Sequence, residues 1–197
     1  AFIQAFKGTD DSPGYIFSTN QDIFLETLCW RGHDANDHMV HLPGLPRYPY
    51  GIESILIPSK ESELSKIFDP PTSITQSKIN YLKLHGSFGW RRDGSDKNYM
   101  VIGVNKKQYI EAEPLLSSYF KKFENMLQMP NTRLFIIGYG FRDIHINEAI
   151  LKGIEKNLLE VIIIDSIQPT EFYHRFVHQS IPSLTIIKYK KLWDEGV

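Results

Sequence analysis

Residues 134–150 read LFIIGYGFRDIHINEAI, and this stretch decides the fold. Four consecutive large apolar residues at 134–137, two of them β-branched, predict a buried strand. Gly138 and Gly140 break that strand, and the apolar spacing that follows predicts a helix to about Ile154. In an open α/β sheet such a turn lies at the carboxyl edge of the strands, where ligands bind.

The polar residues of this turn have two interpretations. Asp143 can cap the helix, with the glycines serving backbone geometry and His145 and Asn147 lying on a solvated face. Alternatively, the same side chains face a ligand at the edge of the sheet. Because capping explains Asp143 fully, both interpretations stay open for this residue.

The composition indicates one globular domain of 197 residues, with 42% apolar and 23% charged residues. A net charge of -1 is not typical of a chain that binds nucleic acid or an acidic membrane. Residues 1–7 are too short and polar for a signal peptide, and no apolar run reaches membrane-spanning length, so we expect a cytoplasmic protein. Cys29 is the only cysteine, which excludes an internal disulfide and a multi-cysteine zinc cluster.

Further elements are predicted along the chain from apolar periodicity and turn residues. We expect strands at 15–18, 79–84, 99–104, 159–164 and 184–189, and helices at 23–30, 59–67, 114–127 and 169–178. The predicted fold class is therefore α/β, Rossmann-like, with a mostly parallel sheet and helices on both faces.

Polar residues follow four of the predicted strands. They are Asn20 and Asp22, then His85, then the turn at 138–147, and finally Asp165. Either Asn20 or Asp22 alone would be explained as a helix cap, whereas an acidic residue closing a strand commonly holds ribose hydroxyls. Since parallel strands with right-handed crossovers end at one edge, we expect one cleft to collect these residues.

A loop region rich in histidine, glycine and proline covers residues 31–71. Its imidazole and carboxylate side chains invite a metal-site interpretation: His33, Asp34, Asp37, His38 and His41. No His-Glu-x-x-His or similar spacing is present, and a long loop needs polar residues in any case. We therefore expect no metal.

Three blocks of sequence resemble the signature blocks of a known family. They are STNQD at 18–22, KLHGS at 83–87 and IGYGFRDIHIN at 137–147. In this order they resemble the sirtuin-like domains of bacterial antiphage defence proteins, over about residues 17–165. The resemblance implies a Rossmann-type domain that binds NAD, and in many members hydrolyses it to nicotinamide and ADP-ribose.

The resemblance also implies roles for individual residues. Asn20 resembles the asparagine that positions the nicotinamide ribose and the attacking water, Asp22 its neighbour near the nicotinamide, and His85 the catalytic histidine. The residues expected beside the cofactor are Thr19, Gly138, Gly140, Phe141, Asp143 and Asp165. A histidine can accept a proton from water or a ribose hydroxyl, which suits this chemistry.

The chain departs from the family pattern at three points. Residues 1–14 hold only Gly8 and Gly14 and lack the glycine-rich phosphate turn, so we expect 1–197 to be a single, N-terminally incomplete domain of a larger protein. Gln21 replaces a more usual aromatic residue, and Gly140 stands where serine is common. One cysteine cannot build the zinc ribbon of sirtuin deacylases.

The sequence leaves three functional hypotheses. The first is an NAD glycohydrolase acting as an abortive-infection effector, with NAD as substrate and no metal. The second is a module that binds NAD or an ADP-ribose-type nucleotide without cleaving it. The third is an oligomerisation domain, and for all three we expect a homo-oligomer or a fused sensor domain as partner.

Overall fold

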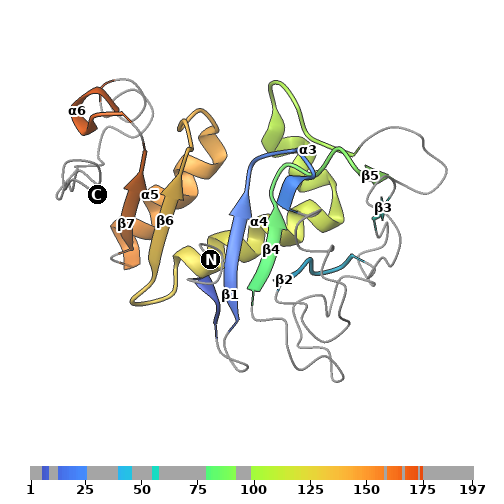
Figure 1. Cartoon of the computed structure of the whole chain (residues 1–197), viewed down its shortest axis with the longest axis horizontal. Helices are drawn as coiled ribbons and strands as arrows, with labels where there is room; N and C mark the ends of the chain where they lie inside the picture. Colours follow the sequence, from blue (N-terminus) through green and yellow to red (C-terminus); the bar gives the residue numbers. More distant parts are fainter. Residues whose placement is uncertain are drawn as a thin grey trace, which may run out of the picture. The chain divides into compact units, whose positions relative to one another are not determined.

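The computed structural model describes residues 6–8, 13–25, 40–45, 55–57, 79–91, 99–157, 159–165, 167–172 and 174. The chain forms two compact units, Ala1–Lys121 and Lys122–Val197 (Figure 1). Every strand pairing among the described residues is parallel, so the α/β class predicted from the sequence is confirmed.

The first unit contains a parallel sheet in the order β1-β4-β2. Its strands are β1 (Gly14–Ser18), β4 (Ile79–Lys83) and β2 (Val40–His41). The central strand β4 is paired on both sides, and all five of its residues are buried. A second small parallel pair joins β3 (Ile55–Leu56) to β5 (Trp90–Arg91).

Two helices follow these strands. They are α3 (Lys106–Ala112) and α4 (Pro114–Leu127), which begins in the first unit and ends in the second. The prediction of a helix at 114–127 is confirmed, since its apolar residues recur at helical spacing and are buried. Within the first unit, the Tyr119 hydroxyl donates a hydrogen bond to the Pro43 carbonyl, and its ring packs edge-on at 6.3 Å from that of Trp90.

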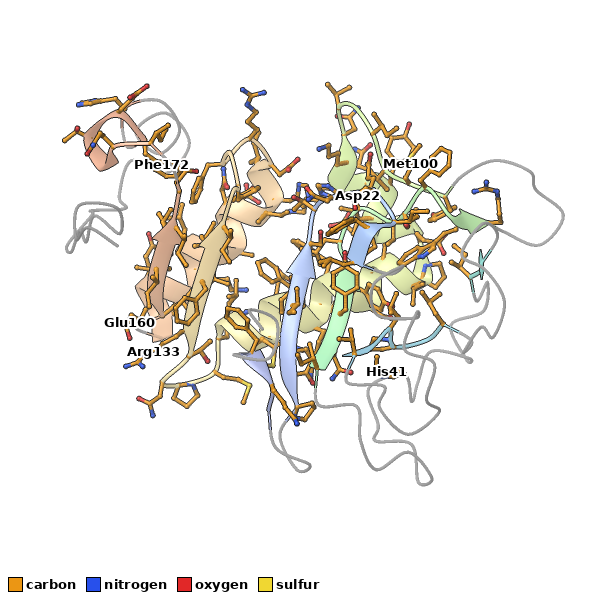
Figure 2. The ribbon with its side chains drawn as sticks, viewed as in Figure 1. Asp22, His41, Met100, Arg133, Glu160 and Phe172 are labelled. Atoms are coloured by element: carbon orange, nitrogen blue, oxygen red, sulfur yellow. The ribbon has the colours of Figure 1, made fainter. Side chains whose placement is uncertain are left out.

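The second unit holds the parallel strands β6 (Arg133–Ile137) and β7 (Glu160–Ile164). Helix α5 (Ile144–Asn157) connects them, and α6 (Pro169–Phe172) follows. Arg133 and Glu160 form an exposed ion pair of 2.6 Å where both strands begin, so the strands end together at the opposite edge (Figure 2).

Residues 134–137 lie in a strand as predicted, but the expectation that this strand is buried is wrong. Ile136 is buried, but Phe135 and Ile137 keep 41% and 50% of their surface exposed. Successive side chains of a strand point to opposite faces, and in the described structure only one face of β6 is covered.

Other sequence predictions differ in outcome. The strand predicted at 99–104 is wrong, because this segment forms only an isolated bridge between Met100 and Gly86. The helix predicted at 23–30 is described only at 24–25, and the one at 169–178 as far as Phe172. The helix at 59–67 and the strand at 184–189 lie outside the described residues.

Candidate functional site

The loops that carry Asn20 and His85 leave the same edge of the first sheet. Ser18 at the end of β1 pairs with Lys83 at the end of β4, and Asn20 and His85 each lie two residues further on. The Leu84 amide donates to the Ser18 carbonyl at 2.9 Å, which extends the pairing beyond the strands. Parallel pairing thus brings these two segments together.

A pocket of about 480 Å³ opens at this edge. It is lined by Ser18, Asn20, Asp22, Phe24, Leu25 and Tyr81. Hydroxyl, amide and carboxylate groups are therefore combined with apolar and aromatic surface, as in pockets for small polar ligands. The His85 side chain is only 2% exposed and is not among the residues that line this pocket.

The exposed residues Asn20 and Asp22 make different hydrogen bonds in the loop that follows β1. Asp22 Oδ1 accepts a hydrogen bond of 2.9 Å from the Phe24 amide, which caps the helical turn at 24–25. Asn20 is fixed through its backbone, because its amide donates to Ser18 Oγ at 3.1 Å. Its carboxamide makes no hydrogen bond with the described residues, which leaves that group available at the pocket.

Gln21 links this loop to the segments that follow β4. Its side-chain amide donates to the Val101 carbonyl at 2.6 Å, and its own carbonyl accepts from the Phe88 amide at 2.8 Å. Gln21 thus ties the loop that holds Asn20 and Asp22 to Phe88 and Val101. In the sequence Gln21 stood out only as a departure from the family pattern, and nothing near it indicated this role.

Lys83 also contributes to this site, although its position in the sequence did not indicate it. Its side chain is 0% exposed, and its ammonium group donates to the Asp22 carbonyl and, at 3.0 Å, to Ser87 Oγ. A buried lysine is rare unless its charge is hydrogen-bonded, so these contacts explain how it is accommodated.

The turn after His85 requires glycine at position 86. Gly86 has φ +74°, and a Cβ atom there would lie 2.4 Å from the Tyr99 carbonyl oxygen. The same close approach lets the Val101 amide donate to the His85 carbonyl at 2.8 Å. The His85 backbone is thus held against residues 99–101.

In the second unit, Gly138 and Asp165 follow a paired end of β6 and β7. Ile137 pairs with Ile164, so Gly138 and Asp165 are the next residues along each strand. Gly138 has φ +62°, and no atom lies within 4 Å of where a Cβ would stand. The exposed Asp165 accepts a hydrogen bond of 3.1 Å from the Ile167 amide through Oδ1.

The rest of this turn is built around Phe141. Its side chain is buried, 4.9 Å from the Tyr139 ring and 5.7 Å from that of Phe172 between centroids. Asn147 Nδ2 donates to the Phe141 carbonyl at 2.8 Å, and Asn147 Oδ1 accepts from the Tyr139 hydroxyl at 3.0 Å. Of the two interpretations of this turn, the one that puts His145 and Asn147 on a solvated face is wrong, because both are buried.

Asp143 and Tyr139 meet at the start of α5. The Asp143 carbonyl accepts hydrogen bonds of 3.0 Å from the Ile146 and Asn147 amides, as an N-cap residue does. Burial, and then the nearby Asp143 charge, raise the pKa of Tyr139 above the usual range for tyrosine. Tyr139 therefore stays a neutral hydrogen-bond donor.

The amino-acid sequence of the chain matches a known protein family. The model of a family described as a SIR2-like domain matches residues 14–169. The chain belongs to the SIR2-like domain family. A comparison with curated protein sequences gave no significant match.

Membership of the SIR2-like family agrees with the parallel strands seen here, since its fold is a Rossmann-like α/β arrangement. It also indicates NAD-related activity, with NAD as the nucleotide. The matched range contains every predicted site residue, from Thr19 to Asp165.

Of the five side chains in the metal hypothesis for this SIR2-like domain, the structure describes one, that of His41. Its Nδ1 lies 3.2 Å from Asn80 Oδ1, and the other residues of the metal hypothesis, His33, Asp34, Asp37 and His38, lie outside the described residues. In the part of the chain that the structure describes, no group of three metal-ligating side chains occurs. No helix in that part is long and apolar enough to cross a membrane.

Proposed function

We propose that this SIR2-like domain hydrolyses NAD to nicotinamide and ADP-ribose. The observation that supports it is the register of β1 and β4, from which Asn20 and His85 follow at equivalent positions, with Asn20 lining the pocket. Asn20 is exposed there, with its carboxamide free for a ribose hydroxyl or a water molecule.

The reaction places defined demands on these residues. The bond between ribose C1′ and the pyridinium nitrogen breaks, and its electron pair goes to that nitrogen and neutralises it. A water oxygen bonds to C1′ and releases one proton. Asn20 orients the ribose and the water, whereas His85 accepts the proton. Asp22 contributes negative charge near the positive charge that builds on the ribose.

The remaining predicted residues belong to NAD binding in this proposal. Thr19 contributes from the first unit. In the second unit, Gly138, Gly140 and Phe141 act through their backbone, because the glycines carry no side chain and the Phe141 ring is buried. Asp143 and Asp165 supply carboxylates, and an acidic residue after a strand commonly holds ribose hydroxyls. The single cleft predicted from the sequence stays a prediction.

The biological role proposed with this activity is antiviral. The resemblance of the three sequence blocks to antiphage defence proteins supports it, since depletion of NAD stops growth of an infected cell. The cytoplasm is the location that this role requires, and a fused sensor domain or a second copy of the chain is the partner proposed to trigger it.

Nicotinamide release from NAD by the purified chain, alone and within its full-length parent protein, tests the enzymatic proposal. Asn20→Ala and His85→Ala are expected to reduce turnover by about a hundredfold or more. Lys152→Ala is the matched control, because Lys152 is exposed on α5. Turnover that is unchanged in both site variants would show that the chemistry does not use these residues.

A second candidate is a module that binds NAD or an ADP-ribose-type nucleotide without cleaving it. The burial of His85 favours it, because a side chain 2% exposed has little access to a substrate. Calorimetric titration with NAD and ADP-ribose, next to the turnover assay, separates the two. Binding without nicotinamide release supports this module, and turnover that depends on His85 contradicts it.

A further inference from the structure

Lys83 joins the two segments that carry Asn20 and His85. It is the last residue of β4, and its side chain reaches away from its own strand to the loop that follows β1. There its ammonium group donates to the Asp22 carbonyl, while it also donates to Ser87 Oγ at 3.0 Å in the turn that follows β4. One amine thus bridges both loops.

Burial of Lys83 costs desolvation free energy, because its charged group is removed from water. The side chain is 0% exposed, and Ser87 is also fully buried. When a lysine is buried, its ammonium group loses the favourable hydration that it has in water. An apolar side chain of similar length has no such hydration to lose. In some proteins a buried charged group specifies one geometry rather than adding stability, and the two contacts of Lys83 favour that role here.

The position that Lys83 holds is the one that matters for the proposed reaction. The Asp22 carbonyl lies two residues after Asn20, and Ser87 lies two residues after His85. Residues 99–101 hold the same loops, because the Gln21 side chain donates to the Val101 carbonyl and the Ser87 amide donates to the Tyr99 carbonyl. The Lys83 side chain hydrogen-bonds to both loops directly, and the Phe88 amide adds a backbone hydrogen bond to the Gln21 carbonyl.

We propose that Lys83 is a positioning residue that sets the Asn20 loop against the His85 turn. The proposal rests on the NAD hydrolysis proposed above for its kinetic consequence, but its structural consequence is independent of that activity. Misplacing a catalytic group by about 1 Å can cost a hundredfold in rate, so loss of the bridge reduces kcat more than it raises KM.

The test compares the full chain with Lys83→Met, which keeps the length of the side chain and removes its donors. Hydrogen–deuterium exchange is expected to rise about tenfold or more in peptides covering 18–25 and 84–91, with β6 and β7 unchanged. In the turnover assay kcat is expected to fall about tenfold or more, with KM changed less than about threefold. Lys121→Met, an exposed lysine on α4 in the same unit, is expected to match the wild type in both assays.

A second variant keeps the proposal testable if Lys83→Met unfolds. Ser87→Ala removes only one acceptor of the amine, and is expected to raise exchange at 84–91 and lower kcat by about threefold or more, with KM unchanged. Wild-type exchange and wild-type kcat in Ser87→Ala, or in a folded Lys83→Met, overturn the positioning role. An inactive wild type with faster loop exchange in the variants overturns NAD hydrolysis and leaves the positioning role standing.

Discussion

Asn147 holds Phe141 in a backbone conformation that side chains rarely adopt. Phe141 has φ +52°, and Asn147 Nδ2 donates to its carbonyl at 2.8 Å from inside the second unit. The other end of the same amide accepts from Tyr139, so one buried side chain fixes two residues of the turn. The strain at Phe141 is thus offset by hydrogen bonds and by burial of its ring.

Asn147→Ala is expected to destabilise the protein by about 1–3 kcal/mol, because it leaves the Phe141 carbonyl and the Tyr139 hydroxyl without this partner. Denaturant unfolding monitored by circular dichroism measures the change. Lys152→Ala, exposed on the same helix, is expected to cost less than about 0.5 kcal/mol. Equal stabilities of the two variants would show that the two Asn147 hydrogen bonds contribute nothing to the free energy of unfolding.

Gly86→Ala and Gly103→Ala form a matched pair. Both glycines have positive φ, of +74° and +85°, so each substitution costs about 1–2 kcal/mol in backbone conformation. Only at Gly86 does the new Cβ also meet a carbonyl oxygen, 2.4 Å away, whereas nothing lies within 4 Å at Gly103. We expect Gly86→Ala to be less stable than Gly103→Ala by at least about 1 kcal/mol.

Thermal or urea unfolding of both variants measures the difference in stability between Gly86→Ala and Gly103→Ala. The turnover assay measures whether the same substitutions affect the proposed site. Because the Gly86 turn holds the His85 backbone, Gly86→Ala is also expected to lower nicotinamide release, whereas Gly103→Ala is not. A Gly103 variant as damaged as the Gly86 variant would mean that backbone conformation alone requires glycine at 86.

The strands, the main helices and the polar strand ends were predictable because their signals are local. Helix α4 has apolar residues at helical spacing, and the segments around β1, β4, β6 and β7 have β-branched or alternating apolar residues followed by turn residues. Capping by Asp22 was one of the two interpretations of its position, and the structure shows that hydrogen bond.

Other features had no local signal. Helix α3 was missed, because Asn105 before it adopts a left-handed conformation without a side-chain cap and Ile110 is its only buried residue. The contacts of Gln21 with Val101 and of Lys83 with Asp22 join residues 80 and 61 positions apart. Such pairings depend on which strands are neighbours, and residue periodicity does not specify that.

The two interpretations of Asp22 predict different effects of Asp22→Asn. Asparagine caps a helix about as well as aspartate, whereas Asp22→Ala loses the cap and about 1 kcal/mol of stability. If the Asp22 charge assists cleavage of NAD, Asp22→Asn keeps wild-type stability but loses turnover, by about tenfold or more. Unfolding curves and nicotinamide release on the same samples decide between the two, and wild-type turnover in Asp22→Asn would leave Asp22 with capping alone.

Tyr139 gives the fold a dependence on alkaline pH. Burial, followed by the Asp143 charge, raises its pKa in the folded state, so the folded protein binds the phenolic proton more tightly than the unfolded chain. The stability from this group is complete below the unfolded pKa of about 10 and is lost as pH rises above it. Tyr139→Phe cannot ionise there, so its urea midpoint is expected to fall less than the wild-type midpoint between about pH 9 and pH 11.

Tyr109→Phe removes an exposed hydroxyl on α3 instead and is expected to follow the wild-type curve. Parallel curves for wild type and Tyr139→Phe would show that the fold does not hold this phenol neutral.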